Sequence, residues 1–169
     1  MILLFAVGCL HTPPHEPLPE PVTIRLAARH EVADGEGRDC SWEEEGLWVG
    51  EHRVLGADPP DDTDWCRSPN DHWATIDVLG QDGRYVSLLT ASDAAKESCR
   101  TWDVVDGRPI TLAEYDEKAA PKRLKRASRL LGRAPIAAPF DPDAFRVRSG
   151  HVTFCLYDAA GVRHELDVP

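Results

Sequence analysis

Residue types that catalyse reactions or bind metals are present, but their spacing matches no familiar site. The seven His residues are scattered, and none stands in a His-Glu-x-x-His pattern. The chain has no Gly-x-Ser-x-Gly nucleophile motif and no Cys-x-x-Cys pair. One group of aspartates lacks the order of an EF-hand calcium loop: Asp58, Asp61, Asp62, Asp64 and Asp71. We therefore predict no catalytic residue, no metal site and no cofactor. The alternatives are a Ca²⁺ site among these aspartates and a metal site assembled only in three dimensions.

The N-terminal residues indicate export and a lipid anchor. Residues 1–8 are apolar, too few to span a bilayer, and typical of the core of a secretory signal peptide. Ala6-Val7-Gly8-Cys9 resembles the lipobox of bacterial lipoproteins, in which the signal is cleaved before a cysteine that is then acylated, for example with palmitate. Five prolines between residues 13 and 21 predict an extended spacer about 30 Å long. We expect a signal peptide at 1–8, lipidated Cys9 and a tether at 9–21, and one domain at 22–169. The alternative for residues 1–8 is a buried strand.

Four cysteines remain if Cys9 carries lipid, and an even number in an exported domain predicts two disulfides. Their positions are Cys40, Cys66, Cys99 and Cys155. Of the three possible pairings we favour Cys40–Cys66, which brackets an acidic segment, together with Cys99–Cys155, which could join two strands. The alternative is four buried free thiols in a cytosolic protein.

The charges are unevenly distributed along the chain. A net charge of −10 argues against a nucleic-acid partner, which needs a basic face. Residues 31–64 hold twelve Asp and Glu against two Arg, whereas residues 118–133 hold seven Lys and Arg and no acid. The basic run predicts a patch for an anionic partner such as phospholipid headgroups or an acidic polymer. Its central residues are Lys122, Arg123, Lys125, Arg126 and Arg129. The alternative is a solvated helix face that complements the acidic segment of the same protein.

Four of the five tryptophans lie in or beside the acidic segment. They are Trp42, Trp48, Trp65 and Trp73. Exposed indole rings could stack on sugars or anchor a protein partner. The alternative is that most of these rings fill a small core.

The pattern of the chain predicts an α+β fold. Alternating or β-branched segments predict strands at residues 22–28, 47–49, 53–55, 73–79, 84–90, 100–105, 144–148, 151–157 and 162–168. Thr111 to Glu114 have the form of a capping box, which predicts a helix to about Ala119. Pro121 and Gly132 fit the start and the end of a second helix. The order of strands, helices and strands predicts a mainly antiparallel sheet with the helices between the central and C-terminal strands.

Residues 84–168 carry short motifs of a known family. They are Arg84-Tyr85-Val86-Ser87-Leu88, then Trp102-Asp103-Val104-Val105-Asp106-Gly107-Arg108-Pro109-Ile110-Thr111-Leu112, then Phe145-Arg146-Val147 and Val152-Thr153-Phe154. This pattern resembles the extracellular domain shared by peptidoglycan deacetylase C and the lysozyme-binding anti-sigma factor of Gram-positive bacteria. The resemblance implies peptidoglycan or a basic, lysozyme-like protein as a ligand. It transfers neither parent activity, because the chain has no deacetylase domain and no sigma-factor-binding segment.

Together these observations predict a non-enzymatic lipoprotein of the bacterial cell envelope. Cys9 would anchor it to a membrane, with the domain facing the periplasm or the cell exterior and acting as a binding module for peptidoglycan or a basic protein. The acidic segment suits a basic partner electrostatically. The alternative is a hydrolase of envelope glycans, for which the many Asp and Glu residues offer no pair that stands out by spacing.

Overall fold

The computed structural model describes residues 15–33, 39–55, 75–91, 97–132 and 140–168, with the backbone alone for residues 27–33 and 39–44. The fold is α+β and built mainly from antiparallel sheets. The strands are β1 (Val22–Ala33), β2 (Asp39–Val49), β3 (His52–Leu55), β4 (Thr75–Asp82), β5 (Tyr85–Ala91), β6 (Ser98–Asp103), β7 (Arg108–Pro109), β8 (Phe145–Arg148), β9 (His151–Tyr157) and β10 (Arg163–Asp167). The helices are α1 (Leu112–Tyr115) and α2 (Ala120–Leu131).

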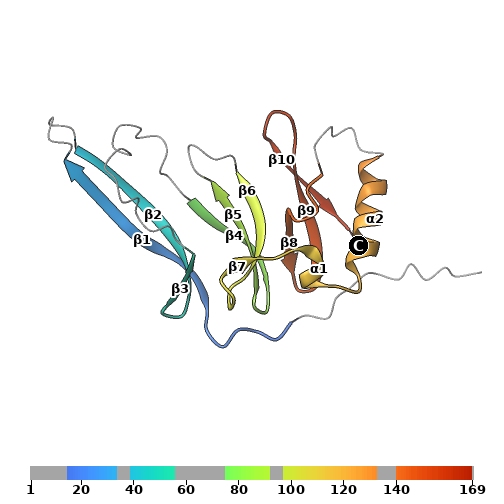
Figure 1. Ribbon diagram of the computed structural model, residues 1–169, viewed down its shortest axis with the longest axis horizontal. Coiled ribbons are helices and arrows are strands. Elements are labelled where there is room, and N and C mark those ends of the chain that lie inside the picture. Colours follow the sequence, from blue (N-terminus) through green and yellow to red (C-terminus); the bar gives the residue numbers. More distant parts are fainter. Residues whose placement is uncertain (1–14, 34–38, 56–74, 92–96, 133–139, 169) are drawn as a thin grey trace, which may run out of the picture.

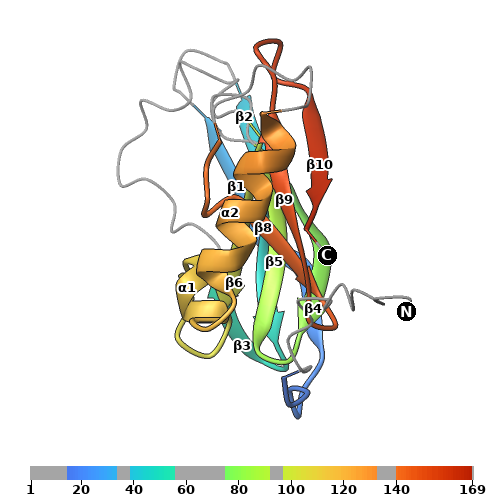
Figure 2. The ribbon, with the colours of Figure 1, turned by 90° about the vertical axis from the view of Figure 1, so that its right-hand side faces the viewer.

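The strands form three sheets that stack as layers. Sheet A has the order β1-β2-β3, sheet B has the order β4-β5-β6-β7, and sheet C has the order β10-β9-β8. Figure 1 shows them side by side in the order A, B, C, with α2 outside sheet C at the opposite end of the longest axis from sheet A. Figure 2, which looks at this end, shows α2 in front of sheet C.

Local sequence signals account for the turns and the helix ends. The β4–β5 hairpin turns at Gly83, whose positive φ of +59° is a conformation that glycine adopts without strain. The capping box of α1 forms, because Thr111 Oγ1 accepts from the Glu114 backbone and the Glu114 carboxylate accepts from the Thr111 backbone. Helix α2 has Pro121 in its first turn and Gly132 as its C-cap, as its pattern predicts.

Sheets A and B are held together by an apolar core. Its buried members are Leu47, Ile76, Val86, Leu88 and Val104. On β5, Val86 and Leu88 lie two apart and therefore point to the same side of the strand. Trp102 packs against this core as a half-buried side chain. Contact between sheets A and B therefore depends mainly on apolar surface removed from water.

Sheets B and C are held together by an apolar core and by hydroxyl groups. The core contains Ile110, Leu112, Tyr115, Ala120, Ala127, Phe145, Val147, Val152, Phe154 and Val168. Strand β8 lies against sheet B, where Thr101 Oγ1 donates to the Phe145 carbonyl at 2.6 Å and Ser87 Oγ accepts from the Val147 backbone at 2.8 Å. These bonds satisfy backbone groups of β8, the edge strand of sheet C, that its own sheet leaves unpaired. A Cβ at Gly80 would clash with the Val147 carbonyl, so glycine permits this close approach.

The structure differs from the sequence prediction in the length of β1, β2 and α1. Strands β1 and β2 pair from Val22 with Val49 to Ala33 with Asp39, far beyond the predicted strands at 22–28 and 47–49. The acidic composition of β2 obscured its length, because Glu and Asp are poor indicators of a strand. Helix α1 ends at Tyr115 rather than near Ala119, because Asp116 leaves the helical conformation with φ −150°.

Candidate functional site

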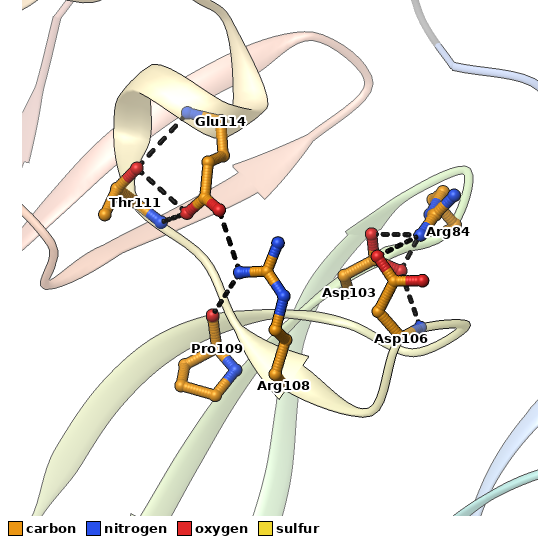
Figure 3. Close-up of polar contacts among 7 residues, drawn as sticks. All are labelled: Arg84, Asp103, Asp106, Arg108, Pro109, Thr111 and Glu114. Atoms are coloured by element: carbon orange, nitrogen blue, oxygen red, sulfur yellow. Dashed lines mark hydrogen bonds and ion pairs between the residues drawn. The ribbon is translucent and has the colours of Figure 1, made fainter.

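Asp103 organises the turn that follows β6. Its Oδ1 accepts hydrogen bonds from Arg84 Nε at 2.7 Å and from the backbone N–H groups of Val105 and Asp106 at 3.0 and 3.2 Å (Figure 3). Arg84 also pairs with Asp106 at 2.9 Å. Burial raises the pKa of Asp103, but these hydrogen bonds outweigh it and hold the pKa below its usual range. Asp103 is therefore an ionised turn residue.

Arg108 and Glu114 connect strand β7 to the start of α1. Arg108 Nη1 donates to Glu114 Oε1 at 2.8 Å, while Glu114 Oε2 accepts from the Thr111 backbone at 2.7 Å (Figure 3). The Thr111 backbone is the largest cause of a lowered pKa at Glu114, followed by Arg108. The residues that carry the family resemblance from Asp103 to Thr111 therefore build a turn and a helix start.

Half-buried His15 and buried Asp82 and Tyr115 form a polar cluster at the turn of β4 and β5. Asp82 Oδ1 accepts from the His15 backbone, and Asp82 Oδ2 lies 2.9 Å from His15 Nδ1 and accepts from Tyr115 Oη at 2.6 Å. The His15 ring packs edge-on against Tyr85, with 4.8 Å between ring centroids. Only 2% of the Asp82 side chain is exposed.

These contacts set the protonation of Asp82 and Tyr115. Burial raises the pKa of Asp82, but the hydrogen bonds from Tyr115 and His15 outweigh it and lower the pKa overall. Burial, followed by the Asp82 carboxylate, raises the pKa of Tyr115 well above its usual value. The cluster therefore joins an ionised carboxylate to a neutral phenol. It fastens the N-terminal segment to the domain, and no motif in the sequence indicates this cluster.

A pocket of about 250 Å³ lies beside the disulfide between Cys99 and Cys155. This disulfide is the second half of the pairing favoured from the sequence, and it joins β6 to β9 across sheets B and C. The lining residues are Glu97, Ser98, Cys99, Arg100, Phe140, Asp141, Ala144, Cys155 and Tyr157. The walls thus combine an aromatic ring, two acids, one arginine and a phenol.

Several buried polar atoms at this pocket have no hydrogen-bond partner among the described residues. They are Glu97 Oε1, Arg100 Nη1 and Tyr157 Oη, together with the neighbouring Arg163 Nη1. Arg163 Nη1 does lie 3.6 Å from Glu97 Oε1 as an ion pair, and Arg100 Nη2 donates to Asp141 at 2.7 Å. Burial and the charge of Glu97 raise the pKa of Tyr157, which keeps its hydroxyl protonated. Buried polar groups usually have partners, and these atoms are almost wholly covered, so a polar ligand would satisfy them once the side chains of the pocket shift to admit it.

The proposed lipidation and disulfide residues are only partly covered. Cys9 and Cys66 lie outside the described residues, and Cys40 lies on β2 where the backbone alone is described. The Cys40–Cys66 pairing and the lipidation of Cys9 therefore stay predictions.

The predicted aromatic patch has one member with a described side chain. Trp65 and Trp73 lie outside the described residues, and Trp42 lies in the part of β2 given by its backbone. Trp48 is half-buried and lies under the Arg25 guanidinium, 5.6 Å from the ring centroid. This contact is a cation–π interaction within sheet A.

The predicted basic patch loses one residue to the core. Lys122, Lys125 and Arg129 are exposed and Arg126 is half-buried, but Arg123 is fully buried. Its guanidinium pairs with Asp116 at 3.6 Å and donates to the Val168 carbonyl at 3.5 Å. Burial lowers the pKa of Arg123. The prediction that Arg123 belongs to an anionic-partner patch is wrong, because position 123 shares the inward face of α2 with two alanines, Ala120 and Ala127.

The described residues contain neither a candidate metal site nor a helix that could span a membrane. Within the described ranges, no group of three or more His, Cys, Asp or Glu residues could hold a metal ion. Neither of the described helices is long and apolar enough to cross a membrane.

Comparison with known proteins gives no family assignment. No protein-family model matches the chain, and no curated protein and no solved structure shows significant similarity to it. The resemblance to the peptidoglycan deacetylase C and anti-sigma factor domain therefore stays a prediction that depends on its short motifs.

Proposed function

We propose that the protein is a non-enzymatic binding module of the bacterial cell envelope, anchored through lipidated Cys9, and that the pocket beside Cys99–Cys155 binds peptidoglycan. The observation that carries this proposal is the set of buried polar atoms without partners at this pocket. They offer donors for a carboxylate and an acceptor for an amine. The short peptides of peptidoglycan carry both groups.

The chemistry of the pocket suits a small charged peptide group. Arg100 is held by Asp141 through one nitrogen, so its guanidinium is positioned while Nη1 keeps a donor for a ligand carboxylate. Glu97 Oε1 offers an acceptor for an ammonium group. Phe140 adds an apolar wall for an aliphatic stem. The volume of about 250 Å³ is of the size of one amino-acid residue rather than of an extended chain.

The disulfide supports both the location and the binding role. A bond between Cys99 and Cys155 suits an oxidising compartment outside the cytoplasm. Arg100 follows Cys99 directly, and Tyr157 lies two residues beyond Cys155. The bond therefore holds the two strands that carry these polar groups at a fixed separation, which reduces the ordering cost of binding.

Retention of the full chain on purified, insoluble peptidoglycan tests this function. We expect Arg100→Gln to weaken retention about tenfold, because it removes a charged hydrogen bond to the ligand. Tyr157→Phe should also weaken retention with little change in thermal stability, since the described residues offer the Tyr157 hydroxyl no more than a weak contact with the Glu97 carboxylate. Arg108→Gln, an exposed arginine outside this pocket, is the matched control.

Three results would overturn this function. Unchanged retention of both pocket variants would exclude the pocket as the site. Capture of a lysozyme-like basic protein, with no retention on peptidoglycan, would show that the ligand is a protein. Release of soluble sugar fragments from the peptidoglycan would show that the protein is a glycan hydrolase.

A further inference from the structure

The N-terminal segment lies along the domain before β1 begins. His15 is fastened to Asp82, and a Cβ at Gly83 would come within 2.5 Å of the Glu16 carbonyl. Leu18 packs against the core between sheets A and B, and the Gly50 backbone donates to the Pro21 carbonyl at 3.2 Å. In Figure 1 this segment, in blue, runs past the ends of the layers to the foot of β1. Residues 15–21 are thus part of the domain surface rather than a free spacer.

This placement sets where a lipid anchor on Cys9 would reach the domain. Five residues lie between Cys9 and His15, so the distance between these two residues is at most about 20 Å. His15 contacts Tyr115 of α1, with 5.1 Å between ring centroids, and Asp116 directly after α1 pairs with Arg123 of α2. The chain from the anchor would therefore join the described domain at His15, beside α1.

The outward face of α2 is basic. Lys122, Lys125 and Arg129 are exposed and follow at spacings of three and four residues, so they form one stripe opposite the buried face of the helix. No Asp or Glu occurs between residues 118 and 133. Sheet A, at the other end of the longest axis, includes the acidic strand β2. Charge thus changes sign along the length of the molecule.

We infer that the exposed face of α2 binds the anionic phospholipid headgroups of the bilayer that holds the Cys9 anchor, with sheet A directed away from that bilayer. The inference depends on the anchor in the proposed function. Each basic side chain near an anionic surface strengthens binding about fivefold. The acidic strand β2 would be repelled by the same surface, so attraction and repulsion favour one orientation.

Flotation with lipid vesicles tests this inference on the full chain carrying Cys9→Ala, which removes the anchor. We expect binding to vesicles of phosphatidylglycerol and phosphatidylcholine, and much weaker binding to phosphatidylcholine alone. Lys122→Glu with Lys125→Glu should weaken anionic binding about 30-fold or more, because two attractive charges are lost. Arg25→Glu with Arg53→Glu changes the net charge equally at exposed positions of sheet A and is the control. Circular dichroism checks that both double variants fold.

The outcomes separate this inference from the proposed function. Equal binding to both vesicle types, or equal losses in the two double variants, would overturn binding through α2. Retention on peptidoglycan by the Lys122→Glu and Lys125→Glu variant should stay at the wild-type level, since neither residue lines the pocket. Fatty-acid labelling of the wild type, absent in Cys9→Ala, tests the anchor separately. A labelled protein whose α2 variants bind vesicles normally would overturn the orientation alone.

Discussion

The two faces of sheet B contact their neighbouring sheets in different ways. Towards sheet A the contact is mainly an apolar core that includes Leu88, to which the Ile76 backbone adds a hydrogen bond with the Glu45 carboxylate at 2.8 Å. Towards sheet C, Ser87 and Thr101 bind the backbone of β8, and Cys99 is bonded to Cys155. Apolar burial is non-directional, whereas hydrogen bonds and a disulfide fix one arrangement. Because the candidate pocket lies on the side of sheet C, the polar and covalent contacts place its walls.

Loss of the disulfide should have the largest effect. The double variant Cys99→Ala with Cys155→Ala removes a disulfide that joins residues 56 positions apart in the sequence. We expect the free energy of unfolding to fall by about 4 kcal/mol, chiefly because the unfolded chain gains freedom. Urea denaturation of the oxidised wild type and the double variant measures the change, and retention on peptidoglycan should fall as well. An unchanged midpoint would show that the bond does not stabilise the domain.

Leu88→Ala tests the apolar face alone. Leu88 is fully buried between sheets A and B. We expect the variant to lose about 3 kcal/mol of unfolding free energy, because truncation removes buried surface and leaves a cavity. Peptidoglycan retention by the folded variant should not change, since Leu88 faces away from the pocket. A loss of retention with an unchanged urea midpoint would contradict the division of roles between the two faces.

Thr101→Val tests the polar face with little change of volume. The substitution removes two hydrogen bonds of Thr101 Oγ1, one to the Phe145 carbonyl at 2.6 Å and one with Ser87 Oγ at 2.9 Å. We expect a loss of about 2 kcal/mol, because buried polar groups lose a partner. Thr101→Ser keeps a hydroxyl and should restore most of the stability. Hydrogen exchange at the Val147 amide should be faster in Thr101→Val than in Thr101→Ser.

Local signals in the sequence predicted much of the fold. The α+β class and the capping box at Thr111 are confirmed, because the residues that signal each element lie within a few positions of one another. The pairing of Cys99 with Cys155, one of the pairs favoured from the sequence, is present in the structure. The length of β2 was missed, because acidic side chains hide a strand whose partner stabilises it.

Most of the candidate site could not be predicted from the sequence, because the site combines residues that lie far apart along the chain. Asp82 contacts His15 and Tyr115, which lie 67 and 33 positions away. The pocket combines residues from 97–100, 140–144 and 155–157, and none of these segments carries a recognisable motif. The prediction that Arg123 belongs to the basic patch used charge alone, because a side chain in a basic run normally faces water. Only the neighbouring alanines hinted that this face of α2 packs inward.

The smallest of these effects should come from Asp82→Asn, which tests whether the polar contacts of sheet B extend to the N-terminal segment. Asp82 accepts hydrogen bonds from Tyr115 and His15, and an amide replaces only part of them. We expect the unfolding free energy to fall by about 1.5 kcal/mol at pH 7, as for a hydrogen bond to a charged group. The variant should also be cleaved faster by a protease within residues 15–21, because the segment is less firmly held.

The pH dependence identifies the role of the Asp82 charge. Because the folded domain lowers the pKa of Asp82, the unfolded chain takes up the proton first as the pH falls below about 4. The stability that the carboxylate provides is therefore fully present at pH 7 and is lost as the pH falls through the lowered pKa. Urea denaturation at pH 7 and pH 3 measures the free energy of unfolding of the wild type and of Asp82→Asn. We expect the difference between the two proteins to be smaller at pH 3. An equal difference in unfolding free energy at pH 7 and pH 3 would mean that side-chain geometry, rather than charge, holds the N-terminal segment against sheet B.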